Sequence, residues 1–172
     1  MKNKSRFVIL TLILFLFNSC ESLNKQKTIK LAHGLDTSHP VHQAMVFMGQ
    51  ELEKNSEGAL KLEIYPNQQL GSERQCLELL QIGSLDMTKV SAAVMENFSP
   101  NMKVLGLPFL FKNKEHTFSV LDGEVGKELL NGGKKYWLKG LGYYDAGSRS
   151  FYTKEAPILK PKNLEGLKIR VM

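Results

Sequence analysis

The chain has 172 residues, of which 42% are hydrophobic and 23% charged, a composition typical of a soluble globular protein of one domain's length. Its formal charge of +6 overstates how basic it is, because Lys2, Lys4 and Arg6 lie in a leader without acidic residues. Of the 23 basic and 17 acidic residues, three of the basic ones lie there, which leaves a net charge of +3. No block of like charges appears and aromatic residues do not alternate with basic ones, which argues against nucleic-acid binding.

The first residues have the organisation of an export signal. The basic start is followed by a nearly unbroken apolar run, Phe7–Phe17, which is too short to span a bilayer comfortably but suits the hydrophobic region of a signal peptide. The segment Leu16–Cys20 resembles a bacterial lipobox, whose cysteine carries the lipid. We therefore predict a signal peptide over residues 1–19, a lipidated Cys20 with a tether over residues 20–27, and a place on the periplasmic or cell-surface side of the cytoplasmic membrane. Because the two residues before the serine depart from the usual lipobox, a plain secretory signal is the alternative.

Cysteine usage agrees with this prediction. If Cys20 carries lipid, Cys76 alone remains and no intrachain disulfide is possible. Cys76 falls within the apolar pattern of a predicted helix, so we expect a buried and unreactive thiol.

The first predicted elements form a strand–helix–strand unit. A strand over Thr28–His33 is followed by a helix from Pro40, whose missing N–H costs nothing at the first helical position, with Ser38 or His39 as its cap. Apolar residues recur at helical spacing until about Asn55. Leu60–Tyr65 then alternates polar and apolar residues as a second strand. Units of this kind build parallel sheets, so we predict an α/β fold.

The pattern continues with a helix opened by Ser72 and Gln75, which form a capping box, and ended at Gly83. The further expected elements are a strand over Leu85–Val90, a short helix over Ala92–Asn97, a strand or extended segment over Lys103–Leu107, a helical stretch over Lys114–Leu130 broken at Asp122–Gly123, extended pieces at Gly140–Tyr144 and Ser150–Thr153, and a final strand over Gly166–Met172.

Four potential metal ligands, His33, Asp36, His39 and His42, fall within ten residues. They leave a metal-binding hydrolase open as a rival hypothesis, although His39 and His42 straddle a helix start rather than share one helical face. His33 stands at the carboxyl end of a strand, where open α/β sheets bind their ligands. A loop histidine with satisfied hydrogen bonds is the alternative for it.

Other catalytic signatures are missing from the sequence. It contains no Gly-x-Ser-x-Gly elbow, no Gly-x-Gly-x-x-Gly motif and no P-loop. We therefore expect no catalytic residue, no cofactor and no metal, and a protein that is not an enzyme.

The charged candidates for ligand binding are Glu73 and Arg74 at a helix start, Arg149 after a glycine turn, and Arg170 in the final strand. A guanidinium can hold a carboxylate through two parallel N–H bonds, so two arginines on neighbouring segments could bind one anion. The alternatives are a favourable helix-dipole interaction for Glu73, a solvated charge for Arg74 and Arg170, and a turn contact for Arg149.

These residues lie within six short motifs in a fixed order. The motifs are Leu31–His33 with Ser38–Pro40, Tyr65–Pro66 with Gln69–Arg74, Gly83–Met87, Leu107–Phe109, Gly147–Arg149 and Gly166–Val171. Together they resemble the solute-binding subunit of tripartite ATP-independent periplasmic (TRAP) transporters, the DctP family, over essentially all of Ile29–Met172. Each motif is weak singly, but six in order at family-like intervals make a strong resemblance.

The resemblance implies roles for individual residues. It implies that Arg170 forms the principal salt bridge to a substrate carboxylate and that Arg149 makes a second contact. It places Glu73, with Arg74 beside it, at the same cleft, which the loop that begins at His33 also lines. Sialic-acid-binding members have a glutamate where this chain has Ser91, so the resemblance argues against sialic acid as the ligand.

The resemblance also implies a periplasmic-binding-protein-like fold of two α/β lobes that close on the ligand by hinge motion. On this basis residues 28–147 form lobe one, and residues 148–172 form the hinge crossover and the start of lobe two. About half of such a protein is present, so we expect a fragment, a split gene product or a truncated reading frame.

The expected function is capture of an organic acid and its delivery to membrane permease subunits. A C4-dicarboxylate is the default ligand, with sugar acids and keto acids next. Glu73 would favour hydroxyl groups on the ligand, because a carboxylate accepts hydrogen bonds but repels a second anion. A lipoprotein remnant that binds nothing is the alternative.

Overall fold

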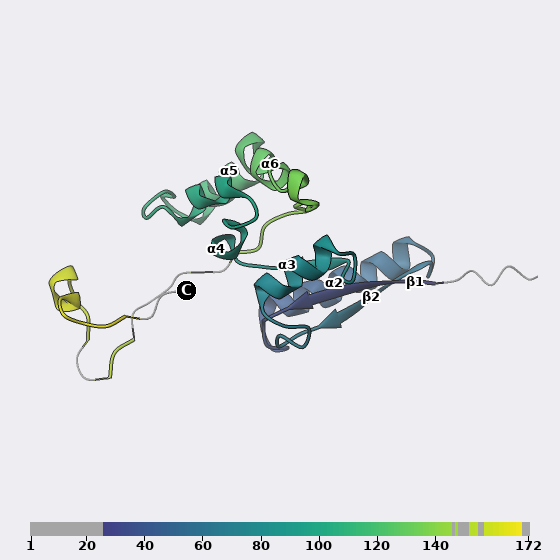
Figure 1. Cartoon of the computed structure of the whole chain (residues 1–172), viewed down its shortest axis with the longest axis horizontal. Helices are drawn as coiled ribbons and strands as arrows, with labels where there is room; N and C mark the ends of the chain where they lie inside the picture. Colours follow the sequence, from purple (N-terminus) through teal and green to yellow (C-terminus); the bar gives the residue numbers. More distant parts are fainter. Residues whose placement is uncertain (1–25, 146, 148–151, 155–156, 170–172) are drawn as a thin grey trace, which may run out of the picture.

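The computed structural model describes residues 26–145, 147, 152–154 and 157–169 (Figure 1). Its elements in chain order are β1 (Lys27–His33), α2 (Pro40–Asn55), β2 (Leu60–Tyr65), α3 (Glu73–Gln81), β3 (Met87–Lys89), α4 (Ala92–Met95), the 3₁₀ helix η1 (Pro100–Gly106), α5 (Lys114–Leu121), α6 (Glu124–Asn131), and the 3₁₀ helices η2 (Lys134–Tyr136) and η3 (Pro161–Leu164). The predicted α/β class is confirmed.

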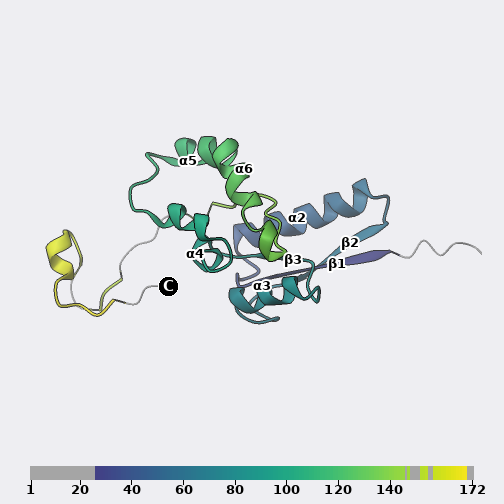
Figure 2. The same ribbon diagram turned by 45° about the horizontal axis from the view of Figure 1, so that its top comes forward.

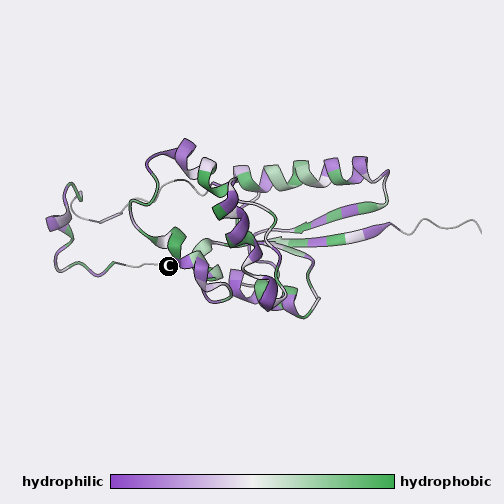
Figure 3. Ribbon diagram, turned by 90° about the horizontal axis from the view of Figure 1, so that it is seen from above, coloured by the Kyte–Doolittle hydropathy of each residue, from purple (hydrophilic) through white to green (hydrophobic). Residues whose placement is uncertain are grey.

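The three strands form a parallel sheet in the order β2-β1-β3. In register, Leu31 of β1 lies between Ile64 of β2 and Met87 of β3. Figure 3 shows hydrophobic and hydrophilic residues alternating along β1 and β2, and this period-2 pattern is the one from which β2 was predicted. The central position of β1 explains why its last three residues are buried.

Helices cover both faces of this sheet, α2 on one and α3 on the other (Figure 2). On the α2 face the buried cluster contains Leu31, Val41 and Met45. On the α3 face it contains Ala32, Cys76 and Leu85. Leu31 and Ala32 are consecutive in β1 and point to opposite faces, so this strand contributes residues to the buried clusters on both faces of the sheet. The expectation of a buried Cys76 is confirmed.

The predicted helix starts are also present. His39 is the N-cap of α2, where its ring Nδ1 accepts a hydrogen bond from the Val41 N–H at 3.1 Å, and Pro40 follows at the first turn. Ser72 caps α3 through the complete capping box with Gln75. Both helices begin after a strand, at the carboxyl edge of the sheet.

A third buried cluster joins this sheet layer to the segments beyond β3. It contains Leu77 from α3, Phe98 after α4, and Leu138 after η2. The predicted helical stretch after residue 114 is present as α5 and α6, which pack on each other and are separated at Asp122–Gly123, as predicted.

The prediction of a strand or extended segment over Lys103–Leu107 is wrong, because most of it lies in η1, which begins at Pro100. A strand needs a neighbour to share its backbone hydrogen bonds, whereas this segment satisfies them locally through helical turns. The third strand is shorter than predicted, since only Met87–Lys89 pairs with β1.

The prediction of a final strand fails within the described residues, because residues 166–169 adopt no strand there. Residues 140–144, predicted as an extended piece, lie outside helices and strands. Ser150 and Phe151, and the last three residues of the chain, lie outside the described residues, as does the leader with Cys20. In the part of the chain that is described, no helix has the length and apolar character needed to cross a membrane.

Candidate functional site

Polar side chains meet at the carboxyl edge of the sheet. β1 ends at His33 and β3 ends at Lys89, and these two residues are partners in the β1–β3 register. α3 begins at Glu73, and Ser91 is the N-cap of α4, directly after β3. Four elements therefore bring these side chains to the edge where open parallel sheets bind their ligands.

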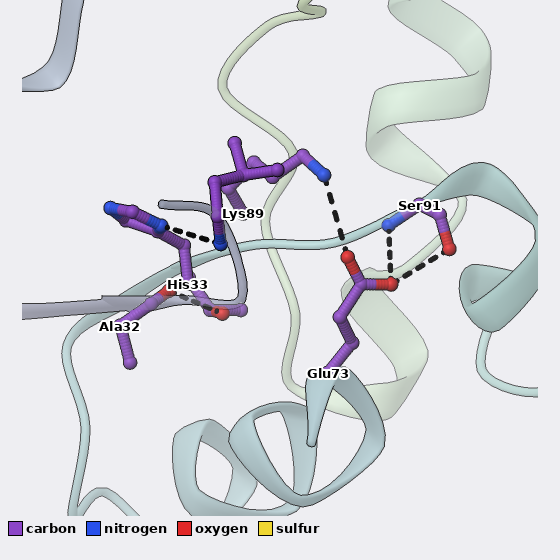
Figure 4. A network of polar contacts seen from close by, with 7 residues as sticks. Ala32, His33, Glu73, Lys89 and Ser91 are labelled. Atoms are coloured by element: carbon purple, nitrogen blue, oxygen red, sulfur yellow. Dashed lines mark hydrogen bonds and ion pairs between the residues drawn. The ribbon is translucent and has the colours of Figure 1, made fainter. Parts of the chain in front are cut away.

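Glu73 is the centre of this arrangement (Figure 4). Its Oε2 accepts hydrogen bonds from the Ser91 backbone N–H at 2.9 Å and from the Ser91 hydroxyl at 2.7 Å. Its Oε1 lies 3.4 Å from Lys89 Nζ, and the two side chains are only 22% and 20% exposed. The carboxylate thus fixes the start of α4 and the end of β3 to the start of α3. Sequence reasoning named Glu73 and Ser91, and the structure brings them into direct contact.

Lys89 was not predicted as a site residue. The only sequence signal was its place near the carboxyl end of a predicted strand, Leu85–Val90, between the apolar Met87 and Val90. A lysine there either reaches solvent or meets an acidic partner. Which of these occurs depends on the start of α3, sixteen residues earlier in the chain.

His33 has satisfied hydrogen bonds in the interior, the alternative that the sequence left open. It is 1% exposed, and its Nδ1 accepts a hydrogen bond from the Leu35 N–H at 3.1 Å. The ring proton must therefore be on Nε2, which lies 3.0 Å from His42 Nδ1 and donates to it. Burial, and then the nearby His42, Lys89 and His39, lower the pKa of His33 from its ordinary value of 6.5. His33 is accordingly neutral at neutral pH.

The four potential metal ligands near His33 do not gather into one site. Asp36 accepts a hydrogen bond from the Ser38 N–H at 2.8 Å, and this contact is the main reason why the pKa of Asp36 is lowered. His39 caps α2, and His42 accepts from His33. Among the described residues, no three His, Cys, Asp or Glu side chains are placed to hold a metal ion.

Of the three candidate arginines, Arg74 is the one that lies within the described residues. Arg74 is exposed, and its Nε lies 3.1 Å from Glu78 Oε1 one helical turn further along α3. This salt bridge matches the solvated-charge alternative and leaves Arg74 apart from the Glu73 contacts. Arg149 and Arg170 lie outside the described residues, and their roles remain predictions.

Asp145 contacts the backbone at Gly147, which precedes Arg149 by two positions in the sequence. Asp145 Oδ1 accepts a hydrogen bond from the Gly147 N–H at 2.8 Å, and Asp145 Oδ2 lies 3.1 Å from Lys114 Nζ on α5. The hydrogen bond with Gly147, and then the contact with Lys114, lower the pKa of Asp145. Gly147 has φ +68°, which a glycine adopts without strain. Through Asp145, Gly147 is thus linked to α5.

Comparison with protein families identifies the chain. Residues 31–172 match the family of bacterial extracellular solute-binding proteins, family 7, also named DctP. The chain belongs to this family. The sequence resemblance to the solute-binding subunits of TRAP transporters is therefore confirmed, and so is the fold class.

Two curated relatives illustrate the match of this DctP-family chain. It is 41% identical to YiiZ of Salmonella typhimurium over 145 residues, which cover 84% of this chain and 44% of YiiZ. It is 32% identical to the C4-dicarboxylate-binding periplasmic protein DctP of Rhodobacter capsulatus, over 89% of this chain and 46% of the relative.

Two solved structures show the same fold. A TRAP periplasmic solute-binding protein from Bradyrhizobium in complex with galacturonate matches with a TM-score of 0.80 and 41% identity, over 84% of this chain and 48% of that one. The sugar acid binding protein DctPAm of Advenella mimigardefordensis, in complex with galactonate, matches with a TM-score of 0.82 and 34% identity, over 86% and 48%. This chain spans about half the length of the relatives that it matches.

Proposed function

We propose that the full protein carrying this chain is the solute-binding subunit of a TRAP transporter. It captures a carboxylate-bearing organic acid outside the cytoplasmic membrane and delivers it to the membrane permease subunits. The observation that supports this most directly is the family match over residues 31–172, which includes both Arg149 and Arg170. The export signal is consistent with this location, and lipidation of Cys20 would anchor the protein at the membrane.

The candidate ligands are C4-dicarboxylates and sugar acids. The relative from Rhodobacter is named for C4-dicarboxylates, and the two similar structures hold galacturonate and galactonate. All of these ligands carry a carboxylate, which is the group that an arginine recognises best. Recognition of a carboxylate is therefore the common element of the proposal.

The proposed mechanism uses the two arginines as carboxylate anchors. Arg170 makes the principal, bidentate salt bridge, and Arg149 makes a second contact with the carboxylate. Closure of the two lobes by hinge motion excludes water, which strengthens the attraction between guanidinium and carboxylate by lowering the local dielectric constant. The carboxyl edge of the sheet, with Lys89 and Glu73, faces the remainder of the ligand.

Isothermal titration of the full-length protein with a panel of C4-dicarboxylates, uronates and aldonates tests this proposal. Arg170→Ala should weaken binding by roughly 30-fold or more, as expected when one partner of a buried charge pair is removed (about 2–5 kcal/mol). Lys54→Ala is the matched control, because Lys54 forms an exposed salt bridge with Glu51. If the wild-type protein binds no acid of the panel, the lipoprotein remnant without binding activity is the better explanation.

A further inference from the structure

Lys89 differs from the other described lysines that form salt bridges. Its side chain is 20% exposed, whereas those of Lys54 and Lys114 are 76% and 70% exposed. A lysine that gives up most of its hydration needs a compensating partner, and Glu73 Oε1 at 3.4 Å is the one found in the described part of the chain. The ammonium group is thus held at the carboxyl edge of the sheet.

The partner of Lys89 has little hydrogen-bonding capacity left. A carboxylate offers about four lone-pair sites. Glu73 already receives two donors from Ser91 on Oε2 and one from Lys89 on Oε1. Lys89, by contrast, has three N–H donors and directs one of them to Glu73. The group with free capacity at this edge is therefore the ammonium, and Glu73 acts as the residue that positions it.

The charges of the pair determine what it prefers. The positive charge of Lys89 is balanced by the negative charge of Glu73, so the pair attracts a second anion only weakly. A hydroxyl oxygen needs no such charge, because it can accept a hydrogen bond from the ammonium as it stands. The arrangement therefore favours a neutral, oxygen-rich ligand end over a second carboxylate.

We propose that Lys89 is a specificity-determining residue that donates hydrogen bonds to the hydroxylated, uncharged end of a monocarboxylic sugar acid. The inference rests on the proposed function, since it concerns the ligand end opposite the carboxylate that the arginines hold. It narrows the substrate class from organic acids in general to polyhydroxy acids with one carboxylate. Glu73 holds the ammonium in place and sets the penalty for a second negative charge.

Pairs of ligands that differ by one charge test this inference. Galactonate and galactarate share an open, hydroxylated chain and differ by one carboxylate. Succinamate and succinate share an unsubstituted chain and likewise differ by one carboxylate. The measured quantity is the ratio of the dissociation constant of the dianion to that of the monoanion, from isothermal titration of the full-length protein. For the wild-type protein we expect a ratio above one.

Two substitutions should move this ratio in opposite directions. Lys89→Met leaves Glu73 unbalanced and should raise the ratio by about five- to tenfold, since a negative charge then faces the second carboxylate. Glu73→Gln leaves Lys89 unbalanced and should lower it by a similar factor. The double variant should return to within about twofold of the wild type. Lys61→Met, which changes an exposed lysine of β2, should leave the ratio unchanged.

A purely structural role of the pair predicts a different result. Damage to the fold weakens both members of a ligand pair equally and leaves the ratio unchanged. If the wild-type protein binds either pair and both variants keep its ratio, or if the wild-type ratio lies below one, the inference is overturned while the proposed function stands. Lack of binding to any acid would overturn the proposed function itself. Lys89→Gln serves as the second variant if Lys89→Met does not fold.

Discussion

The buried contact between His33 and His42 should make the stability of this fold sensitive to mild acid. His33 is 1% exposed, donates from Nε2 to His42 and accepts at Nδ1 from the Leu35 N–H. An added proton on His33 must go to Nδ1, so the hydrogen bond from the Leu35 N–H is lost and a charge is buried. Protonation of His33 therefore lowers the free energy of unfolding.

The sign and size of the effect follow from linkage. The pKa of His33 is lowered in the folded state, mainly by burial, so the unfolded chain binds the proton more readily below pH 6.5. The stability is therefore fully present above that pH and falls as the pH decreases toward the folded-state pKa. Because the folded chain binds one proton fewer than the unfolded chain, the free energy of unfolding falls by at most about 1.4 kcal/mol per pH unit. Between pH 6.5 and pH 5.5 the loss is about 1 kcal/mol.

Urea unfolding followed by circular dichroism at pH 7.5, 6.5 and 5.5 measures this dependence. His33→Gln removes the titrating ring while keeping polar atoms at the site, so it should be less stable at pH 7.5 but lose less stability on acidification. His116→Gln, a histidine change on α5 outside this contact, should keep the wild-type acid dependence. If His33→Gln loses stability with acid as steeply as the wild type, the buried histidine pair is not the cause.

Three further predictions concern the core and the helix ends. Met45→Ala should reduce the free energy of unfolding by about 2–5 kcal/mol, because Met45 is fully buried, whereas Phe47→Ala on the exposed side of α2 should change it by less than about 1 kcal/mol in the same urea assay. Ser72→Ala should cost about 1 kcal/mol through loss of the capping box, and an unchanged midpoint would contradict that role. The Cys76 thiol, whose pKa is raised chiefly by burial, should react with a thiol reagent only after urea unfolds the protein, and rapid labelling of the folded protein would count against it.

Local patterns predicted the first part of the fold well. The strands at Thr28–His33 and Leu60–Tyr65 and the helix from Pro40 are present within about a residue of their predicted bounds. Leu60–Tyr65 alternates polar and apolar residues, the helix repeats apolar residues at helical spacing, and the ends have chemical signals, such as a proline at the first helical position. Such information lies within a few residues of the element and needs no tertiary context.

The failed predictions depended on partners that are distant in sequence. Lys103–Leu107 is a short, mostly apolar run before Pro108, yet most of it lies in η1, because such a run does not tell whether a neighbouring strand is available. Likewise, residues 166–169 carry the pattern of a strand without forming one in the described structure. A strand pattern in the sequence indicates that a segment is suited to a strand. Whether the strand forms depends on a neighbouring strand being available in the sheet.

The candidate site shows the same division between local and distant information. Glu73 was named as a charged residue at a helix start and Ser91 from the resemblance to the DctP family, but their hydrogen bonds join residues eighteen positions apart. Lys89 enters the site because β3 pairs with the central strand and ends beside the start of α3. Glu73 and Ser91 could be named from the sequence, whereas the part played by Lys89 and the contacts among the three residues could not.

The contact between Ser91 and Glu73 gives a physical reason to expect that sialic acid is not the ligand. According to the resemblance, sialic-acid-binding members carry a glutamate at the position of Ser91. In this chain the Ser91 hydroxyl lies 2.7 Å from Glu73 Oε2 and donates to it. A carboxylate in that place would replace the donor by a second acceptor, and two carboxylates in contact cannot both remain ionised at little cost. Lys89 alone could balance only one of them. The serine therefore belongs with Glu73 and Lys89 as one charge-balanced set, and a change of ligand class at this edge would require the three positions to change together.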